Sequence, residues 1–364
     1  MVHWNTTAAQ GAQAAQAAQA AQGAQIEIRD SLPVSDASGR PVNSGWARKP
    51  LFQYNAAQMR GPIRRITESD RYVIFSSTYM LILEVLDGGL LGHIGVSLIS
   101  LMDKNRSTQT FSLPFSMGSL NMPSDSETGS VKIRYKQWMI EFAAMEGGAR
   151  IIKVDIPNFD RRRYLRGAVV LTPPSQAESL VTNVSWRGEK NAFRLSLHAP
   201  CYAAEGVMQL GASELFFAKG GAWGILDWNR GSRPRSDIRF WAAACGSSGG
   251  RQIGFSVGYG SADSSLGTDN AFFVDGMLHK LDQVTFHISP SNWLLPWRFT
   301  SNDNRLEMIF VPHQERFEHN QVLLHSLKRR QVCGSFSGKV ILDDGSPLVF
   351  ENVTGMAERR KTRF

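Results

Sequence analysis

The chain has 364 residues, 42% of them apolar and 10% aromatic, so it can bury a sizeable core and exceeds the usual length of one domain. Thirty-three glycines and fifteen prolines, with few long helical runs, favour a turn-rich β architecture. Its 40 basic and 32 acidic residues leave a net charge of +8, and its three cysteines lack paired spacing, which argues against a disulfide framework or a zinc site.

Much of the basic excess is clustered, at residues 161–163, 328–330 and 359–363. Clusters of this kind usually form solvated faces, and the alternative is contact with an anionic membrane surface or a protein partner. No RNA-binding signature accompanies them, so nucleic acid is not expected as a partner.

The N-terminal 25 residues have the composition of a low-complexity tail. Residues 6–25 repeat an Ala/Gln triplet, TTAAQGAQAAQAAQAAQGAQ. Ala and Gln are good helix formers, but no large apolar side chain is present to bury, so an isolated helix would be marginal. The tail is predicted to be disordered or loosely helical. It lacks the apolar stretch of a signal peptide, which favours a cytoplasmic protein.

The rest of the chain has the pattern of strands joined by tight turns. An irregular arm rich in Gly, Pro and Ser spans residues 26–60. The apolar region 80–102 is interrupted by charges and carries DGG at its centre, which predicts a hairpin and not a membrane span. The stretch VKIRYK at 131–136 alternates apolar and basic side chains, which is typical of a half-buried strand.

The predicted fold class is all-β, with well over a dozen strands and little helix. Antiparallel meanders remove their exposed edges by closing into barrels, and the length suits two consecutive antiparallel barrels or strongly curved sheets. The pattern loosens around residues 173–190. We therefore predict a first barrel-like domain at 61–180 and a second at 181–364 that includes the basic C-terminal tail.

Several segments, in this order, resemble the domain of unknown function 2804 family: GWARKPLFQYN, WGILDWNRG, TDNAFFVDGMLHKL, PWRFTSNDNRLEMIFVP, QVCGSFSGKV and GMAE. That family is similar to the calycin group, so the resemblance implies paired lipocalin-like barrels, as in relatives of carotenoid 1,2-hydratase. The family pattern has an aromatic–proline pair after DWNRG, whereas this chain has Ser232-Arg233-Pro234. An aromatic wall of a site is then missing or supplied from elsewhere.

The segment WGILDWNRG places Asp227 among two tryptophans, Trp223 and Trp228, with Arg230 close by. Tryptophans around a carboxyl group remove its hydration, which raises its pKa and lets it donate a proton near neutral pH. Arg230 would instead hold the carboxyl ionised. Asp227 is therefore a candidate general acid, with the tryptophans stabilising positive charge. The alternative is a buried Asp227–Arg230 pair that closes a barrel turn.

The segment TDNAFFVDGMLHKL supplies a second cluster. Asp269 and Asn270 precede a strand where a barrel mouth would lie, so they either contact a ligand or cap their own backbone. His279 has the parity of an inward-facing residue, so it is a hydrogen-bonded core histidine or a second catalytic proton donor. Asp275-Gly276 is predicted to form a hairpin turn.

Trp297 and Arg298, in NWLLPWRF, repeat the aromatic–guanidinium theme and are either ligand-binding residues or a plug at the closed end of a lipocalin-like barrel. The sequence has no nucleophile elbow, P-loop or H-E-x-x-H motif, and its histidines are dispersed. We therefore expect no cofactor and no metal.

Three functions remain open at this point. The leading hypothesis is binding of a hydrophobic small molecule, lipid-like or isoprenoid, in a barrel cavity. The second is a cofactor-free hydratase, isomerase or cyclase, which needs Asp227 to have a raised pKa and no ion-pair partner. The third is a structural or assembly subunit whose barrels are packed solid with side chains. A carrier needs only the cavity and tolerates Asp227→Asn.

Overall fold

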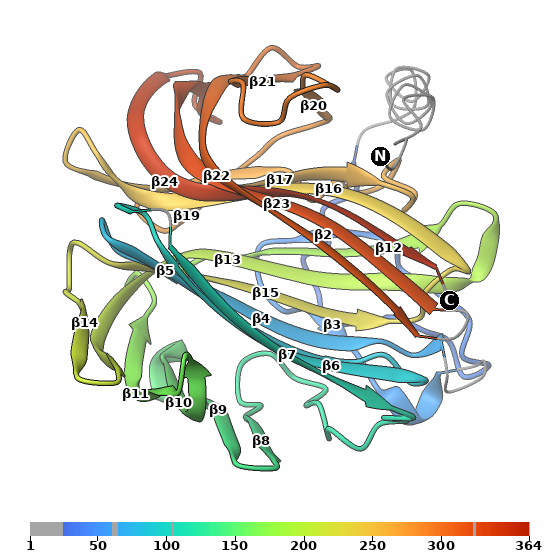
Figure 1. Ribbon diagram of the computed structural model, residues 1–364. Coiled ribbons are helices and arrows are strands. Elements are labelled where there is room, and N and C mark those ends of the chain that lie inside the picture. Colours follow the sequence, from blue (N-terminus) through green and yellow to red (C-terminus); the bar gives the residue numbers. More distant parts are fainter. Residues whose placement is uncertain (1–24, 60–64, 104, 323–324, 364) are drawn as a thin grey trace.

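The structure is a computed structural model that describes residues 25–59, 65–103, 105–322 and 325–363. It confirms the all-β prediction, because two curled antiparallel sheets hold nearly all the strands of the described residues and stack one above the other (Figure 1). The described residues include the short 3-10 turns η1 (Ala56–Gln58) and η3 (Glu146–Gly148), and Arg65 also has the 3-10 conformation. The predicted low-complexity tail lies outside the described residues, apart from Gln25.

The first sheet has the strand order β7-β6-β5-β4-β15-β13-β11-β10-β9-β8, with β2, β12 and β14 joined to it through β13 and β12. Its 13 strands within the described residues are β2 (Gly45–Ala47), β4 (Glu68–Phe75), β5 (Tyr79–Asp87), β6 (Leu91–Ser100), β7 (Arg106–Pro114), β8 (Val131–Tyr135), β9 (Trp138–Ala144), β10 (Arg150–Asp160), β11 (Arg163–Thr172), β12 (Leu180–Trp186), β13 (Glu189–Leu210), β14 (Ser213–Phe217) and β15 (Trp223–Gly231). A separate parallel pair, β1 (Leu32–Pro33) and β3 (Phe52–Gln53), lies in the N-terminal arm.

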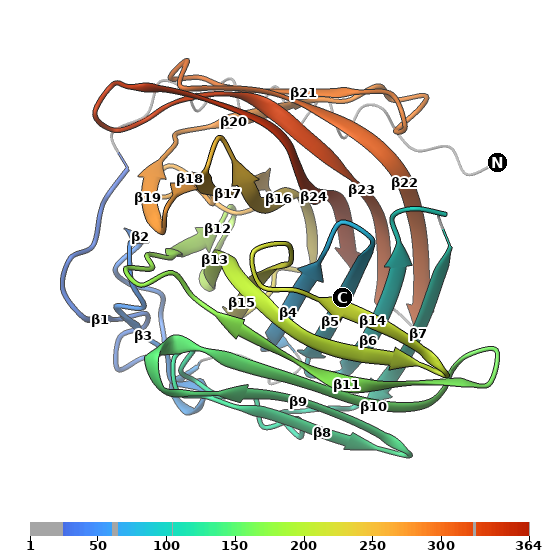
Figure 2. The same ribbon diagram turned by 90° about the vertical axis from the view of Figure 1, so that its left-hand side faces the viewer.

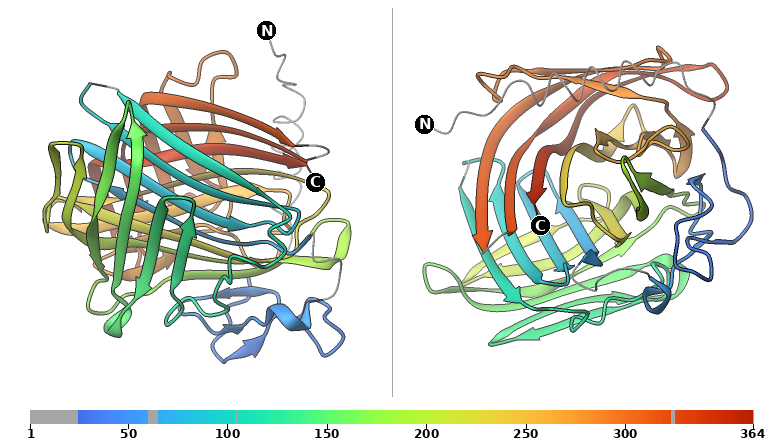
Figure 3. Two further views of the ribbon diagram at one scale, coloured as in Figure 1. Left: turned by 60° about the horizontal axis from the view of Figure 1, so that its bottom comes forward. Right: turned by 90° about the vertical axis from the view of Figure 1, so that its right-hand side faces the viewer.

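The second sheet has the order β19-β18-β17-β16-β24-β23-β22-β21-β20. Its nine strands within the described ranges are β16 (Ser236–Ser248), β17 (Arg251–Gly260), β18 (Ala271–Val274), β19 (Met277–Lys280), β20 (Val284–His287), β21 (Trp297–Ser301), β22 (Leu306–Val322), β23 (His325–Ile341) and β24 (Pro347–Arg363). The long strands β22, β23 and β24 curve down beside β4 to β7 of the first sheet (Figures 2 and 3).

The chain passes from the first sheet to the second between Gly231 and Ser236. The strands over 180–231, which the sequence placed with the second half, pair instead within the first sheet: β13 pairs with β11, and β15 pairs with β4. The physical reason is the long-range β15–β4 ladder, which strand periodicity does not reveal. The division of the chain into two folding domains stays a prediction.

The central strands are buried on both faces, so their alternating side chains enter two different layers. In β15, Leu226 and Trp228 pack in the core of the first sheet, while Ile225 and Asp227 face the second sheet. In β16, Trp241 faces the first sheet in the same way. The described residues thus form a core inside each curled sheet and a middle layer between the sheets, besides a small cluster around Val184 and Trp186.

Candidate functional site

The residues of WGILDWNRG, which form β15, point alternately to the two sides of the first sheet. Asp227 is 3% exposed and faces the second sheet, whereas Trp228 lies in the core of the first sheet. Trp223 lies at the edge of the apolar part of the middle layer and is only half-buried. The carboxyl group is therefore not enclosed by both tryptophans, because neighbouring strand residues point to opposite faces.

Asp227 pairs with Arg71 on the neighbouring strand β4. The Arg71 guanidinium donates to Asp227 Oδ2 through Nη2 at 2.7 Å and Nε at 3.1 Å. Its Nη1 donates to Glu358 of β24 at 2.8 Å and 2.9 Å, and the guanidinium lies 4.5 Å from the Trp241 ring centroid. Arg71 thereby joins one carboxylate from each sheet.

Arg230, the partner expected for Asp227, bonds elsewhere. It donates to Asp70 at 2.8 Å and to the carbonyl oxygen of Pro123 at 2.8 Å and 2.9 Å, and its guanidinium stacks on Trp228 at 4.2 Å. The Arg230–Trp228 stack is on the face of β15 opposite to Asp227. Both predicted residues support the loop at Pro123 and the core of the first sheet.

The Arg71 contacts are part of a larger set of buried charges, which we call the charged layer. In this layer Glu84 of β5 accepts from Arg329 of β23 at 2.7 Å and 2.9 Å, a bidentate pair that joins the two sheets. The charged layer comprises Arg71, Glu84, Arg194, His198, Asp227, Arg239, Asp269, Arg329 and Glu358.

Asp269 occupies the other end of the charged layer. It accepts hydrogen bonds from Arg194, from Thr182 at 2.6 Å and from Ser196 at 3.1 Å, and Arg239 lies 3.4 Å away. Asp269 was predicted at a barrel mouth, but it is 6% exposed and its oxygens are already bonded to protein donors. Its geometry is that of a structural anion.

The acids of the charged layer are held in their ionised form. Burial alone would raise the pKa of Asp227, but the charges of Arg71 and Arg239 outweigh burial and keep this pKa below its ordinary value. The same balance, with Arg194 and Arg239 as the main cations, lowers the pKa of Asp269. A general acid needs a raised pKa and no ion-pair partner. Asp227 instead has a lowered pKa and is paired with Arg71.

His198 lies between the two aspartates of the charged layer and is fully buried. Its Nδ1 is 3.4 Å from Asp227 Oδ1, and its Nε2 is 3.1 Å from Arg239 Nη2. Burial lowers the pKa of His198 to about 4, although both aspartates favour its charged form. The imidazole is neutral near pH 7, so the layer contains four arginines balanced by four carboxylates.

The remaining predicted site residues lie apart from the charged layer. His279 is half-buried on β19, where its Nδ1 accepts from the Asp343 backbone N–H at 3.2 Å. Asn270 accepts from the Gly258 N–H at 2.6 Å and donates to the Asp282 carbonyl at 2.7 Å, so it links backbone segments of the second sheet.

Trp297 and Arg298 lie on opposite faces of β21, as Asp227 and Trp228 do on β15. Trp297 is fully buried in the aromatic core of the second sheet, and its indole N–H donates to the Trp293 carbonyl at 2.9 Å. Arg298 is on the outer face, paired at 2.8 Å with the exposed Glu307. Their contacts are those of a core residue and a surface ion pair.

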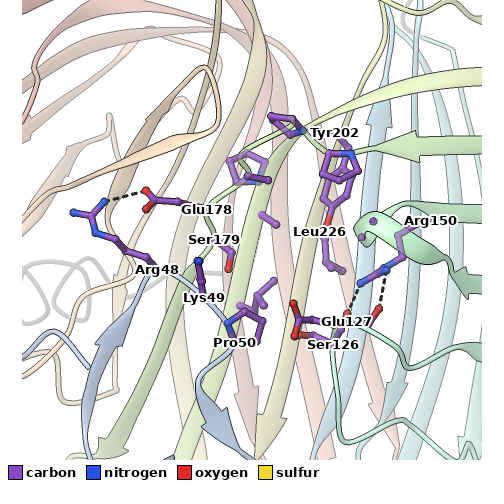
Figure 4. Close-up of a pocket in the computed structure, with 18 of the residues that line it drawn as sticks. Arg48, Lys49, Pro50, Ser126, Glu127, Arg150, Glu178, Ser179, Tyr202 and Leu226 are labelled. Atoms are coloured by element: carbon purple, nitrogen blue, oxygen red, sulfur yellow. Dashed lines mark hydrogen bonds and ion pairs between the residues drawn. The ribbon is translucent and has the colours of Figure 1, made fainter. Parts of the chain in front are cut away.

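A cavity of about 360 Å³ lies at one end of the first sheet (Figure 4). Its floor is apolar, formed by Leu197, Ala199, Tyr202 and Leu226 from β13 and β15. Its walls are the N-terminal arm at 48–50, the loop at 126–127, the hairpin at 147–150 and the loop at 173–179. An adjoining cavity of about 230 Å³ shares Pro50, Ser126 and Leu197 with it and reaches the predicted Trp228.

One wall of this cavity carries a buried cation, Arg150, which is 4% exposed. Its guanidinium donates to the backbone carbonyls of Ser126, of Glu127 at 3.1 Å and of Ala149 at 3.1 Å (Figure 4). No carboxylate within the described residues forms an ion pair with Arg150. A buried guanidinium bound only by neutral acceptors can still attract a ligand acceptor, although the Glu127 side chain lines the same cavity.

The described part of the chain contains no group of three or more His, Cys, Asp or Glu side chains placed to hold a metal ion. Cys201, Cys245 and Cys333 are buried free thiols. No helix in the described ranges has the length and apolar character to cross a membrane.

The family model described as a domain of unknown function, DUF2804, matches residues 25–364. The chain belongs to this family. The match confirms the resemblance carried by the WGILDWNRG and PWRF segments. No curated protein matches the sequence of this DUF2804 member.

Among solved structures, CghA matches with a TM-score of 0.54 alone and 0.51 with Sch210972, at 11% identity, over 94% of this chain and 97% of CghA. Kievitone hydratase from Nectria haematococca matches with a TM-score of 0.44 at 9% identity, over 94% of this chain and 98% of the other. At 11% identity the likeness to CghA shows a shared fold and leaves the chemistry open.

Most residues of the charged layer are not among those predicted from the sequence, although the strand patterns carry a signal for them. In RYVIF, Arg71 has the parity of the buried Val73, and in MLILEVL, Glu84 has the parity of the buried Ile82. Arg239 and Trp241 show the same pattern in IRFWAAAC. A charged residue at a strand position that shares its face with buried apolar residues indicates a buried ion pair, because burying an unpaired charge costs too much free energy.

Proposed function

We propose that the protein binds an apolar small molecule that carries a hydrogen-bond acceptor, in the cavity of about 360 Å³ on the first sheet. The observation that carries this proposal is an apolar floor facing a buried guanidinium that has no carboxylate partner within the described residues. Ligand sites of this type are mostly apolar, with a few polar groups that orient the ligand.

The two sheets differ in a way that supports binding over a purely structural role. The core of the second sheet is filled by aromatic rings in direct contact, such as Phe310 and Phe336 with centroids 4.3 Å apart. The first sheet instead combines its core with the two adjoining cavities. CghA, which shares the fold, has been solved with Sch210972. A subunit packed solid throughout would lack the space that the first sheet provides.

The ligand's orientation follows from the wall residues. Its apolar body would lie on Leu197, Ala199 and Leu226, and its acceptor would face Arg150. Arg48 is a weaker candidate for this role, because it is already paired with Glu178 at 3.0 Å and with Glu27 at 3.1 Å. Asp227 lies on the other face of β15, so this proposal assigns it no contact with the ligand.

The test uses the neutral fluorophore N-phenyl-1-naphthylamine with the full-length chain. Ala177 is exposed on the loop that lines the cavity, so Ala177→Trp should obstruct the cavity without disturbing a core. Ala37→Trp, at an exposed turn outside the cavity, is the matched control. We expect saturable binding to the wild type and to Ala37→Trp, and at least tenfold weaker binding to Ala177→Trp.

Native mass spectrometry of protein from its own host supplies the second measurement. Wild type should carry a bound apolar compound that is extracted with organic solvent, and Ala177→Trp should carry less of it. Absence of any extractable compound, together with equal fluorophore binding by both tryptophan variants, would contradict the proposal.

A further inference from the structure

We propose that a pocket between the two sheets, next to Arg329, Arg360 and Thr362, binds a small oxyanion, the carboxylate or phosphate group of a ligand. This pocket has a volume of about 50 Å³ and is separate from the cavity of Figure 4. Its lining comes from both sheets and includes Glu84 and His93 from the first.

The pocket borders a row of three arginines on adjacent strands of the second sheet. Arg360 of β24 is directly opposite Arg239 of β16 on one side and Arg329 of β23 on the other. Directly opposed residues share one face of a sheet, and like charges in these positions repel one another. The row therefore needs negative charge near its centre.

The outer two arginines of the row contact a carboxylate of the described residues, and the central one does not. Arg239 lies 3.4 Å from Asp269, and Arg329 forms the bidentate pair with Glu84. Arg360 forms no ion pair with a carboxylate of the described residues. Glu358 is bonded to Arg71 at 2.8 Å and so is already paired. Arg360 thus stands between two other guanidinium groups with no carboxylate of the described residues in ion-pair contact, and the carboxylates nearest in the electrostatics are Glu358 and the buried Asp237, which lies directly opposite Thr362.

Unused polar atoms on the pocket residues point to the same ligand class. Thr362 and Arg329 are each only 4% exposed. The Thr362 hydroxyl and the Nε groups of Arg329 and Arg360 are buried without a hydrogen-bond partner in the described structure. All three can donate, and buried donors without partners are rare and costly. One oxyanion could satisfy several of them at once.

A second arginine lines the pocket beside Arg360. Arg233, in the Ser232-Arg233-Pro234 stretch where the sequence departs from its family pattern, also lines the pocket. Burial, and then repulsion by Arg360, lower the pKa of Arg233 to about 9. The pKa of His93 is lowered by its burial, so its imidazole adds no positive charge near pH 7. Glu84 is the one carboxylate among the described lining residues, against Arg233, Arg329, Arg360 and Arg363, and the buried Asp237 lies directly opposite Thr362.

The size of the pocket restricts the ligand group. One water molecule needs roughly 10–15 Å³ of such space, so about 50 Å³ admits a group of a few heavy atoms. A carboxylate or a phosphate has this size and matches the donors of arginine. Leu86, Leu91 and Leu327 also line the pocket, so an apolar continuation of the ligand could lie against them.

The experiment titrates the full-length protein with sodium phosphate and, separately, with sodium octanoate, at ionic strength held constant with NaCl. Thermal unfolding and isothermal titration calorimetry are the readouts. We expect a saturable rise in Tm and measurable heat with at least one anion. Preference for phosphate identifies a free or esterified phosphate, and preference for octanoate identifies an organic carboxylate.

Two variants and one control make the assignment specific. Arg360→Gln and Thr362→Val should each weaken anion binding at least tenfold, while Arg298→Gln, which alters an exposed ion pair, should not change it. Without anion, Arg360→Gln should be at least as stable as wild type, because it removes repulsion from the arginine row. An Arg360 with only a structural role would instead make this variant less stable.

The proposal is overturned if neither anion shifts Tm beyond the NaCl control, or if the shift persists unchanged in Arg360→Gln. The outcome is independent of the first cavity, because N-phenyl-1-naphthylamine is uncharged and Ala177 is not part of the pocket lining. Loss of one kind of binding with retention of the other shows which of the two proposals has failed.

Discussion

At the scale of single residues, His198 links the charged layer to pH. The groups that face its ring are Arg194, Asp227, Arg239, Trp241 and Asp269. Its pKa is about 4 in the folded protein and 6.5 when unperturbed, because burial disfavours the imidazolium. Between these values the unfolded chain binds more protons than the folded chain. The contribution of His198 to the free energy of unfolding is therefore full above pH 6.5 and falls as the pH drops towards 4.

We therefore expect the free energy of unfolding to fall by up to about 3 kcal/mol between pH 6.5 and pH 4 through this one residue. His198→Gln should remove that part of the pH dependence. Urea unfolding of both proteins at pH 6.5, 5 and 4 measures the difference. An equal slope in wild type and variant would show that another group is responsible.

Asp227 provides a second residue-scale prediction, which separates structure from catalysis. Asp227→Asn leaves Arg71 with Glu358 as its one remaining carboxylate partner and should destabilise the fold by about 3 kcal/mol, since the charged layer then holds one more buried positive charge than negative charges. Binding of N-phenyl-1-naphthylamine should be unchanged. Glu307→Gln, in an exposed pair with Arg298, is the control and should cost less than about 1 kcal/mol.

At the scale of elements, two glycines allow β11 and β13 to coil against each other. Gly167 and Gly206 have φ of +150° and +155°, and a Cβ on either would lie 2.2 Å from a carbonyl oxygen of the opposite strand. Gly206→Ala should cost roughly 1–3 kcal/mol from backbone strain, with the clash in addition. Gly220→Ala, where φ is +84° and the space is open, controls for strain alone. Equal losses in urea unfolding would show that close strand contact is unimportant.

The turns were the elements most accessible from the sequence, because turn chemistry is local. DGG at 87–89 joins β5 to β6 and Asp275-Gly276 joins β18 to β19, as predicted. The partners of central strands were not accessible. Both faces of β15 are buried, so alternation separates Asp227 from Trp228 without indicating which layer each one enters.

The site was less accessible than the fold for the same reason. Arg71 meets Asp227 across 156 residues and Glu358 across 287, and only the stacking of two sheets brings them together. Arg230, three residues from Asp227, was the natural partner by spacing but points to the other face. Local sequence could indicate that a strand carries a buried charge, but it could not identify the neutralising partner.

At the scale of the whole molecule, the middle layer makes the two sheets depend on each other. Separating them would expose the apolar side chains of the layer and break the Arg71–Glu358 and Glu84–Arg329 contacts, each of which joins one sheet to the other. The charged side chains of each sheet would then lose their ion-pair partners on the other sheet. Both sheets lose these contacts together, so unfolding of one sheet destabilises the other.

We therefore expect one cooperative unfolding transition for the full chain. Hydrogen exchange in increasing urea, read by mass spectrometry, should show the same midpoint for peptides of β13 in the first sheet and β24 in the second. A midpoint for β24 that is distinctly lower would mean that the second sheet opens alone and that the middle layer contributes little.

The pair Glu84→Gln with Arg329→Met tests the coupling directly: the double variant should lose less stability than the sum of the single variants, because each single change leaves a buried charge unpaired.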